Sequence, residues 1–175
     1  MLQRRNRARS RAGSAMVEFA LVMPVMVGLL LGVMAYGYDF YIYARLEDAV
    51  RGAARYATSA NQKYDAYAGL DPDLSCGAAT TCMVQLDSET SLLARRTANF
   101  AVFGTPNPSG DETPLVPGLT TANIVVSVEV LNNRPKNIWV AVNGFRLLTP
   151  TGSIYLENKP AAVFPWFGNY TLASE

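Results

Sequence analysis

The stretch GSAMVEFALVMPVMVGLLLGVMAYGYDFYIY, residues 13–43, decides the fold of this chain. From Ala15 to Tyr38 it is apolar almost throughout, with a single charge at Glu18. As a helix this segment would be about 36 Å long, which is enough to cross a bilayer core of about 30 Å. A secretory signal peptide has a shorter apolar region followed by small residues at its cleavage site, whereas here the small residues come first. The stretch therefore predicts a retained transmembrane anchor. A buried core helix is the alternative, but a helix apolar on all faces is hard to bury in so small a chain.

Basic residues crowd the N-terminal flank of the predicted anchor. Arginine-rich flanks stay in the cytoplasm, so we expect a cytoplasmic N-terminus and an extracytoplasmic C-terminal part. The polar residues after Arg4-Arg5 argue against a twin-arginine signal. The flank contains five arginines: Arg4, Arg5, Arg7, Arg9 and Arg11.

Glu18 is the unusual residue of the anchor. An acid inside the membrane costs about 2.5–3.5 kcal/mol on insertion scales, and such residues are functional by default. Two interpretations stay open. Glu18 lies near the cytoplasmic interface and reaches the lipid headgroups, or it has a cation as its partner within the membrane.

The residues around Glu18 resemble a type IV prepilin processing site. Gly13 stands at the last leader position, Glu18 is the fifth residue of the mature chain, and the aromatic Phe19 follows. The wider sequence over residues 11–58 resembles the TadE/TadF-like pseudopilins of bacterial tight-adherence (type IV-like) pili. These residues are just over a quarter of the chain. The N-terminal pattern is common to both kinds, so it does not separate a TadE-like from a TadF-like member.

The resemblance implies a maturation step. A prepilin peptidase would cut between Gly13 and Ser14 and remove the leader, residues 1–13. The new α-ammonium of Ser14 would then pair with Glu18 on the same helix or on a neighbouring one. Such a pair penalises axial misregister between subunits, because a slipped helix leaves a buried charge unpaired.

Composition limits the other functions. Without the leader, ten Lys and Arg face 14 Asp and Glu, so no basic surface is predicted for nucleic acid. Histidine is absent, and no paired catalytic motif stands out, so we expect no enzyme activity, catalytic residue, metal or cofactor. Cys76 and Cys82 are the two cysteines, and an extracytoplasmic location would let them form a disulfide, with two free thiols as the alternative.

The remaining pattern predicts an α+β fold, pilin-like as the resemblance implies. Residues 14–60 are expected to form a transmembrane helix that continues as an amphipathic helix, with Pro24 as a kink. Leu46, Val50, Ala53 and Ala57 form one stripe, expected to pack on the chain's own domain rather than on partner helices. Residues 61–175 are the predicted extracytoplasmic domain. It contains a loop over 60–87, a helix over 88–102, a hairpin of strands 122–131 and 138–142, and short strands at 145–148, 153–156, 161–164 and 170–172. Trp139, Trp166 and Phe167 are expected to fill the core or an interface.

The leading hypothesis is a minor pseudopilin in the bacterial inner membrane that also enters or initiates a surface pilus. The resemblance implies its partners: the prepilin peptidase, the major pilin, other pseudopilins and the inner-membrane platform proteins. The alternative is a membrane-tethered adhesin or secretion accessory module that is not incorporated into the filament.

Overall fold

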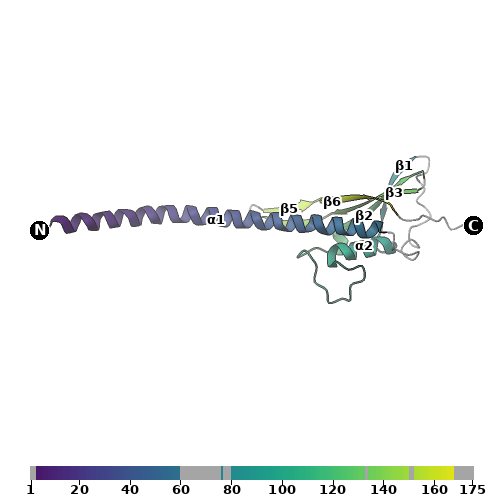
Figure 1. Cartoon of the computed structure of the whole chain (residues 1–175), viewed down its shortest axis with the longest axis horizontal. Helices are drawn as coiled ribbons and strands as arrows, with labels where there is room; N and C mark the ends of the chain where they lie inside the picture. Colours follow the sequence, from purple (N-terminus) through teal and green to yellow (C-terminus); the bar gives the residue numbers. More distant parts are fainter. Residues whose placement is uncertain (1–2, 60–75, 77–79, 133, 150–151, 168–175) are drawn as a thin grey trace, which may run out of the picture.

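The computed structural model of the chain describes residues 3–59, 76, 80–132, 134–149 and 152–167. Apart from those of residues 134 and 149, side chains are described from residue 15 onward. The C-terminal part of a long helix packs in a small domain, and its N-terminal part projects from the domain as a rod (Figure 1). The elements confirm the predicted α+β class, in the order α1 (Gln3–Thr58), β1 (Thr81–Leu86), α2 (Leu92–Phe103), the 3-10 turn η2 (Thr121–Asn123), β2 (Ile124–Leu131), β3 (Arg134–Val142), β4 (Phe145–Thr149), β5 (Gly152–Leu156) and β6 (Ala161–Pro165).

The helix α1 is continuous over 56 residues. It begins well before residue 14, the predicted start of the helix, because the Arg and Ala residues of the basic flank are themselves good helix formers. Its end at Thr58 agrees with the predicted one. No helix boundary therefore separates residues 3–13 from the apolar segment.

The two halves of α1 have different surroundings. From Met16 to Tyr41 nearly all its large apolar side chains are exposed. From Ile42 onward one face is buried in the domain, including Leu46, Val50, Ala53 and Ala57. The predicted packing of this stripe on the chain's own domain is thus confirmed. Its small residues let α2 come close, since a Cβ on Gly52 would lie 3.5 Å from the Phe100 ring.

The helix α2 starts later than predicted. Ser91 caps it by accepting a hydrogen bond from the Ala94 amide (3.3 Å), so residues 88–90 remain outside. It ends at Phe103, one residue beyond the predicted end, because Gly104 has a φ of 77° and its amide donates a hydrogen bond to the Phe100 carbonyl oxygen. A left-handed residue at this position is the usual reason for a glycine there.

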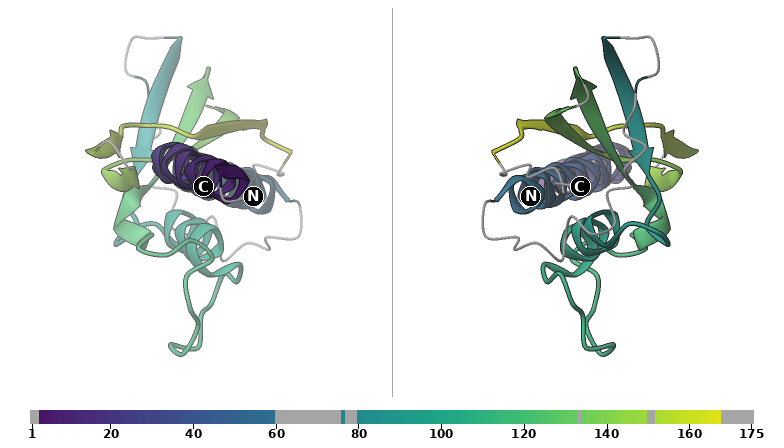
Figure 2. Two further views of the ribbon diagram at one scale, coloured as in Figure 1. Left: turned by 90° about the vertical axis from the view of Figure 1, so that its left-hand side faces the viewer. Right: turned by 90° about the vertical axis from the view of Figure 1, so that its right-hand side faces the viewer.

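The domain is a four-stranded antiparallel sheet with two helices on one face (Figure 2). The strand order is β1-β2-β3-β6. α1 contacts β3 and β6, while α2 contacts β2 and lies beside α1. The β2–β3 hairpin was predicted, and the predicted apolar face of Ile124, Val126, Val128 and Val130 is the buried one.

The prediction of a loop throughout residues 60–87 is wrong at its end. Residues 81–86 form β1, an edge strand paired with β2. Cys82, Val84 and Leu86 alternate toward the core, a weak period-2 signal that the neighbouring turn residues obscured. Two smaller differences concern where the hairpin strands begin. β2 begins at Ile124, after η2, rather than at residue 122, and β3 begins at Arg134 rather than at residue 138. The candidate strand 170–172 lies outside the described residues.

The strands predicted at 145–148 and 153–156 are present as β4 and β5, and they pair with each other in a second, two-stranded sheet. Phe145 is buried, and Leu147 and Leu156 pack against the core. Among the predicted aromatic fillers, Trp166 packs against the core, but Trp139 lies on the outer face of the sheet and Phe167 is exposed. These two side chains therefore do not belong to the core.

Candidate processing and assembly segment

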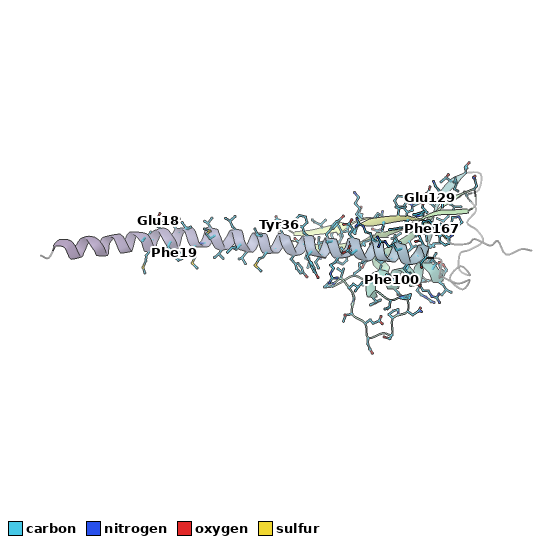
Figure 3. All side chains as sticks on the ribbon, in the orientation of Figure 1. Glu18, Phe19, Tyr36, Phe100, Glu129 and Phe167 are labelled. Carbon is cyan, nitrogen blue, oxygen red and sulfur yellow. A yellow bond between two sulfur atoms is a disulfide. The ribbon has the colours of Figure 1, made fainter. Side chains whose placement is uncertain are left out.

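Glu18 and Phe19 lie on the projecting half of α1, far from the domain (Figure 3). Both side chains are exposed and surrounded by exposed apolar residues. Among the described side chains, Glu18 forms neither a hydrogen bond nor an ion pair. An unpaired carboxylate on an otherwise apolar surface requires a partner if that surface is removed from water.

The helix places Ser14 and Glu18 one turn apart on the same face. Four residues correspond to a rise of about 6 Å, and helical side chains lean toward the N-terminus, so the Glu18 carboxylate leans toward Ser14. In the intact chain the Ser14 nitrogen is an amide inside α1. Hydrolysis of the Gly13–Ser14 bond would turn it into an ammonium within reach of that carboxylate.

Gly13 lies within the helix, and so does the bond that follows it. A peptide must be extended to enter a protease cleft, so α1 has to unwind locally before this bond can be cut. Glycine lowers the cost, because it is about 1 kcal/mol less favourable than alanine inside a helix. The structure brings Gly13, Ser14 and Glu18 together in adjacent turns of one helix. The side chains of the five leader arginines lie outside the described part of the chain.

Pro24 does not interrupt α1. Because proline has no N–H, the Ala20 carbonyl, four residues earlier, has no donor within the helix. The ribbon curves gently over its whole length (Figure 1). Pro24 therefore marks a position of weakened backbone hydrogen bonding rather than a break.

A group of exposed aromatic residues lies on α1 just before the part that packs in the domain. Tyr36, Tyr38, Phe40 and Tyr41 are exposed, as in an aromatic belt at a membrane interface. Asp39 lies among them, and its Oδ2 atom is buried without a hydrogen-bond partner within the described residues.

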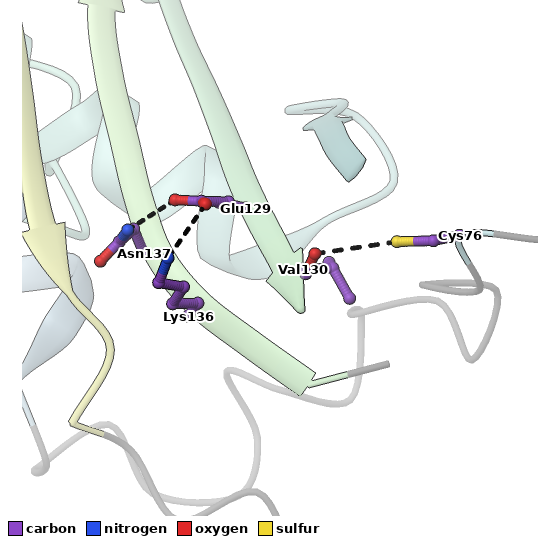
Figure 4. Close-up of polar contacts among 5 residues, drawn as sticks. All are labelled: Cys76, Glu129, Val130, Lys136 and Asn137. Carbon is purple, nitrogen blue, oxygen red and sulfur yellow. Dashed lines mark hydrogen bonds and ion pairs between the residues drawn. The ribbon is translucent and has the colours of Figure 1, made fainter. Parts of the chain in front are cut away.

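The outer face of the sheet has a polar cluster that the sequence did not single out (Figure 4). Asn137 donates a hydrogen bond to Glu129, and Lys136 lies 3.5 Å from the same carboxylate. The Asn137 hydrogen bond lowers the pKa of Glu129, with a smaller contribution from Lys136. Glu129 and Asn137 are paired in register across β2 and β3, a contact that depends on strand alignment.

Cys76 and Cys82 form a disulfide in the structure, with their Cα atoms 5.5 Å apart. The Sγ atom of Cys76 lies 3.8 Å from the Val130 carbonyl oxygen (Figure 4). Because a disulfide sulfur has no proton to donate, this is a packing contact. The disulfide attaches residue 76 to the edge strand β1.

A comparison with known protein families gives a match to the N-terminal segment of the chain. The model of the family described as TadE-like protein matches residues 13–55. This segment is TadE-like. The TadE-like segment is about a quarter of the chain and includes Gly13, Ser14, Glu18 and most of α1. This match supports involvement of the chain in the Tad pilus system.

The apolar part of the TadE-like segment is long enough to span a membrane once. A single-pass membrane protein is consistent with this helix. The searches of curated proteins and of solved structures gave no significant match. The arrangement of the domain after residue 55 is therefore known here from the structure alone.

Proposed function

We propose that the chain is a minor pseudopilin of a tight-adherence pilus, matured by a prepilin peptidase and used in the initiation, assembly or tip of the filament. The observation that carries the proposal is the placement of Gly13, Ser14 and Glu18 in adjacent turns at the start of an exposed apolar helix, within the TadE-like match. The chain would lie in the bacterial inner membrane with its N-terminus in the cytoplasm. Its role would be structural rather than enzymatic.

The maturation step is a hydrolysis. Water adds to the Gly13 carbonyl carbon, and the bond to the Ser14 nitrogen breaks. Gly13 keeps a carboxylate on the released leader, while the Ser14 amine takes up a proton. The mature chain loses five arginines and gains one cation four residues from Glu18.

The assembly step uses the exposed half of α1. Its apolar side chains offer packing surface to the helices of the major pilin, of other pseudopilins and of the inner-membrane platform proteins. An ammonium–carboxylate pair in this apolar setting favours the axial alignment that keeps both charges paired. Domain contacts on the extracytoplasmic side would add to this alignment.

The first test is the N-terminal sequence of the protein from cells with and without the prepilin peptidase. The mature chain should begin at Ser14 only when the peptidase is present. Gly13→Leu should accumulate as the full-length form, because its side chain and its helix preference both oppose an extended fit in the cleft. Gly28→Ala is the matched control, since a Cβ at Gly28 has open space around it, and this variant should be processed normally.

The alternative function is a membrane-tethered adhesin or secretion accessory module outside the filament. The exposed Trp139 on the outer face of the sheet favours it, because this face offers an apolar contact surface. Mass spectrometry of sheared surface filaments separates the two functions. A mature chain in the filament fraction supports the pseudopilin, whereas retention in the membrane alone supports the tether.

A further inference from the structure

The β4–β5 hairpin projects from the domain toward the exposed half of α1. It leaves the core at the paired residues Phe145 and Leu156 and ends at the paired residues Thr149 and Gly152. Four residues of strand correspond to about 13 Å. In Figure 1, β5 is on the side of the domain nearest the N-terminal half of α1, and β1 is on the opposite side.

Behind its closing Thr149–Gly152 pair, the hairpin exposes two apolar side chains. Leu148 is 68% exposed and Ile154 is 53% exposed. One pair closer to the core, the Arg146 guanidinium lies 5.9 Å from the centre of the Tyr155 ring, which is itself 61% exposed. Toward the core, these two apolar side chains are thus followed by an aromatic ring and a cation.

This order of side chains matches the depth profile of a membrane surface. Apolar side chains suit the boundary of the acyl chains, while tyrosine and arginine suit the headgroup region and its phosphates. In a filament contact between proteins, the Arg146 cation would need an acidic partner. Among lipids, anionic headgroups provide that partner over the entire surface.

The expected position of the bilayer along α1 would place the membrane surface close to the hairpin. A hydrocarbon core of about 30 Å takes up about 20 helical residues, so a span that begins near Phe19 ends near Tyr38. The first residue of α1 buried in the domain is Ile42. The domain therefore starts about one helical turn from the bilayer, and the hairpin extends toward it.

We propose that the β4–β5 hairpin is a second membrane contact, with Leu148 and Ile154 in the outer-leaflet interface and with Arg146 at the lipid phosphates. The inference depends on the proposed function only through the spanning of the membrane by α1. The contact would hold the domain in one orientation relative to the bilayer while α1 remains in the membrane. It would have to be released when a subunit leaves the bilayer for the filament.

The experiment uses the full chain with one added cysteine, Leu148→Cys, labelled with an environment-sensitive fluorophore. The two native cysteines are joined to each other and do not compete for the label. The protein is reconstituted in vesicles of equal amounts of phosphatidylcholine and phosphatidylglycerol, with and without lipids that carry a nitroxide quencher on the headgroup. Met83→Cys is the matched control, because Met83 is 54% exposed on the edge strand β1, away from the hairpin.

Quenching at position 148 should exceed quenching at position 83 by at least about twofold, as expected for an interfacial side chain. Arg146→Glu should reduce this excess in the anionic vesicles. Equal quenching at both positions would overturn the proposal, and so would a label at 148 that responds only to an added second copy of the chain. Flotation of the vesicles reports separately on the anchor: a chain that does not float with them fails as a membrane protein, whereas one that floats with an unquenched label 148 fails only in this contact.

Discussion

Glu18 is the one charged residue between Ala15 and Tyr38, and it lies on an otherwise apolar surface. Its position one turn after Ser14 would bring the charge close to a cation if the Gly13–Ser14 bond were cut, as we propose. In the uncut chain, the cations nearest to Glu18 in the sequence are the five arginines of residues 4–11. The proposed cut would remove these five charges and leave a single ammonium at Ser14, four residues before Glu18.

We predict that Glu18→Gln reduces recovery of the mature chain in sheared filaments at least about tenfold. The amide keeps the size of the side chain but cannot pair with the Ser14 ammonium, and loss of one partner of a buried pair costs several kcal/mol. Quantitative mass spectrometry of the filament fraction measures the effect. Glu47→Gln is the matched control, because Glu47 pairs with Arg51 on an exposed surface of α1 and its loss should leave recovery unchanged. Normal maturation and normal recovery of Glu18→Gln would contradict the pairing.

The lowered pKa of Glu129 should make the stability of the domain depend on pH. Its pKa lies below the ordinary value of 4.5 in the folded protein, chiefly because of the Asn137 hydrogen bond. A lowered pKa stabilises the folded state above pH 4.5, and this contribution is lost as the pH falls through the folded pKa. We therefore expect Glu129→Gln to lower the Tm at neutral pH, and the difference from the unchanged chain to shrink below pH 4.5. Thermal unfolding at several pH values measures it, and Glu157→Gln is an exposed control that leaves the Glu129 contacts intact. A difference that grows on acidification would show that the sign is wrong.

At the scale of elements, the close approach of α1 and α2 depends on small residues. Tyr56 stacks on Phe100 with ring centroids 4.9 Å apart, and Gly52 lies against the same ring. The two glycines at this pair of helices have different roles. Gly52 is helical with room for a Cβ at an ordinary contact distance, whereas Gly104 has a positive φ that a side chain opposes.

Gly52→Ala should raise the free energy of unfolding by about 0.5–1 kcal/mol, because alanine loses less conformational entropy in a helix. Gly104→Ala should lower it by about 1–2 kcal/mol, because an L-residue is strained in the left-handed conformation. The two variants add the same methyl group and differ only in backbone geometry. Denaturant unfolding of the detergent-solubilised chain gives both values. Destabilisation by Gly52→Ala would mean that the Phe100 ring cannot accept the added contact.

The sequence predicts elements well where periodicity is long, and poorly where it is short. The stripe from Leu46 to Ala57 and the alternation in β2 each extend over several repeats, so α1 and the β2–β3 hairpin were predicted. β1 has only six residues next to turn-forming residues, and its place depends on pairing with β2 far along the chain. The Glu129–Asn137 contact needs the register of two strands, which no local pattern specifies. The proximity of Gly13, Ser14 and Glu18 could be predicted because these residues are close in sequence and lie in one helix. The hairpin surface could not, because it depends on the direction in which β4 and β5 leave the core.

The whole molecule consists of a projecting rod and a domain that share one helix. The domain uses α1 only from Ile42 onward, since the buried residues of α1 begin there. The apolar half is fully exposed and contributes no packing to the domain. The part of α1 that packs in the domain and the exposed apolar part are therefore separate stretches of a single continuous helix.

A chain that begins at Asp39 should accordingly fold without the membrane segment, with a Tm within a few degrees of that of the full chain in detergent. A chain that begins at Gly52 should fail to fold, because it lacks Ile42, Leu46 and Val50, each of which contributes about 1.5–3 kcal/mol by burial. Such a loss is comparable to the entire stability of a small domain. Circular dichroism and thermal unfolding distinguish the two chains. If the chain from Asp39 were unfolded, the exposed apolar half of α1 would be needed for folding, and the domain would not be a folding unit of its own.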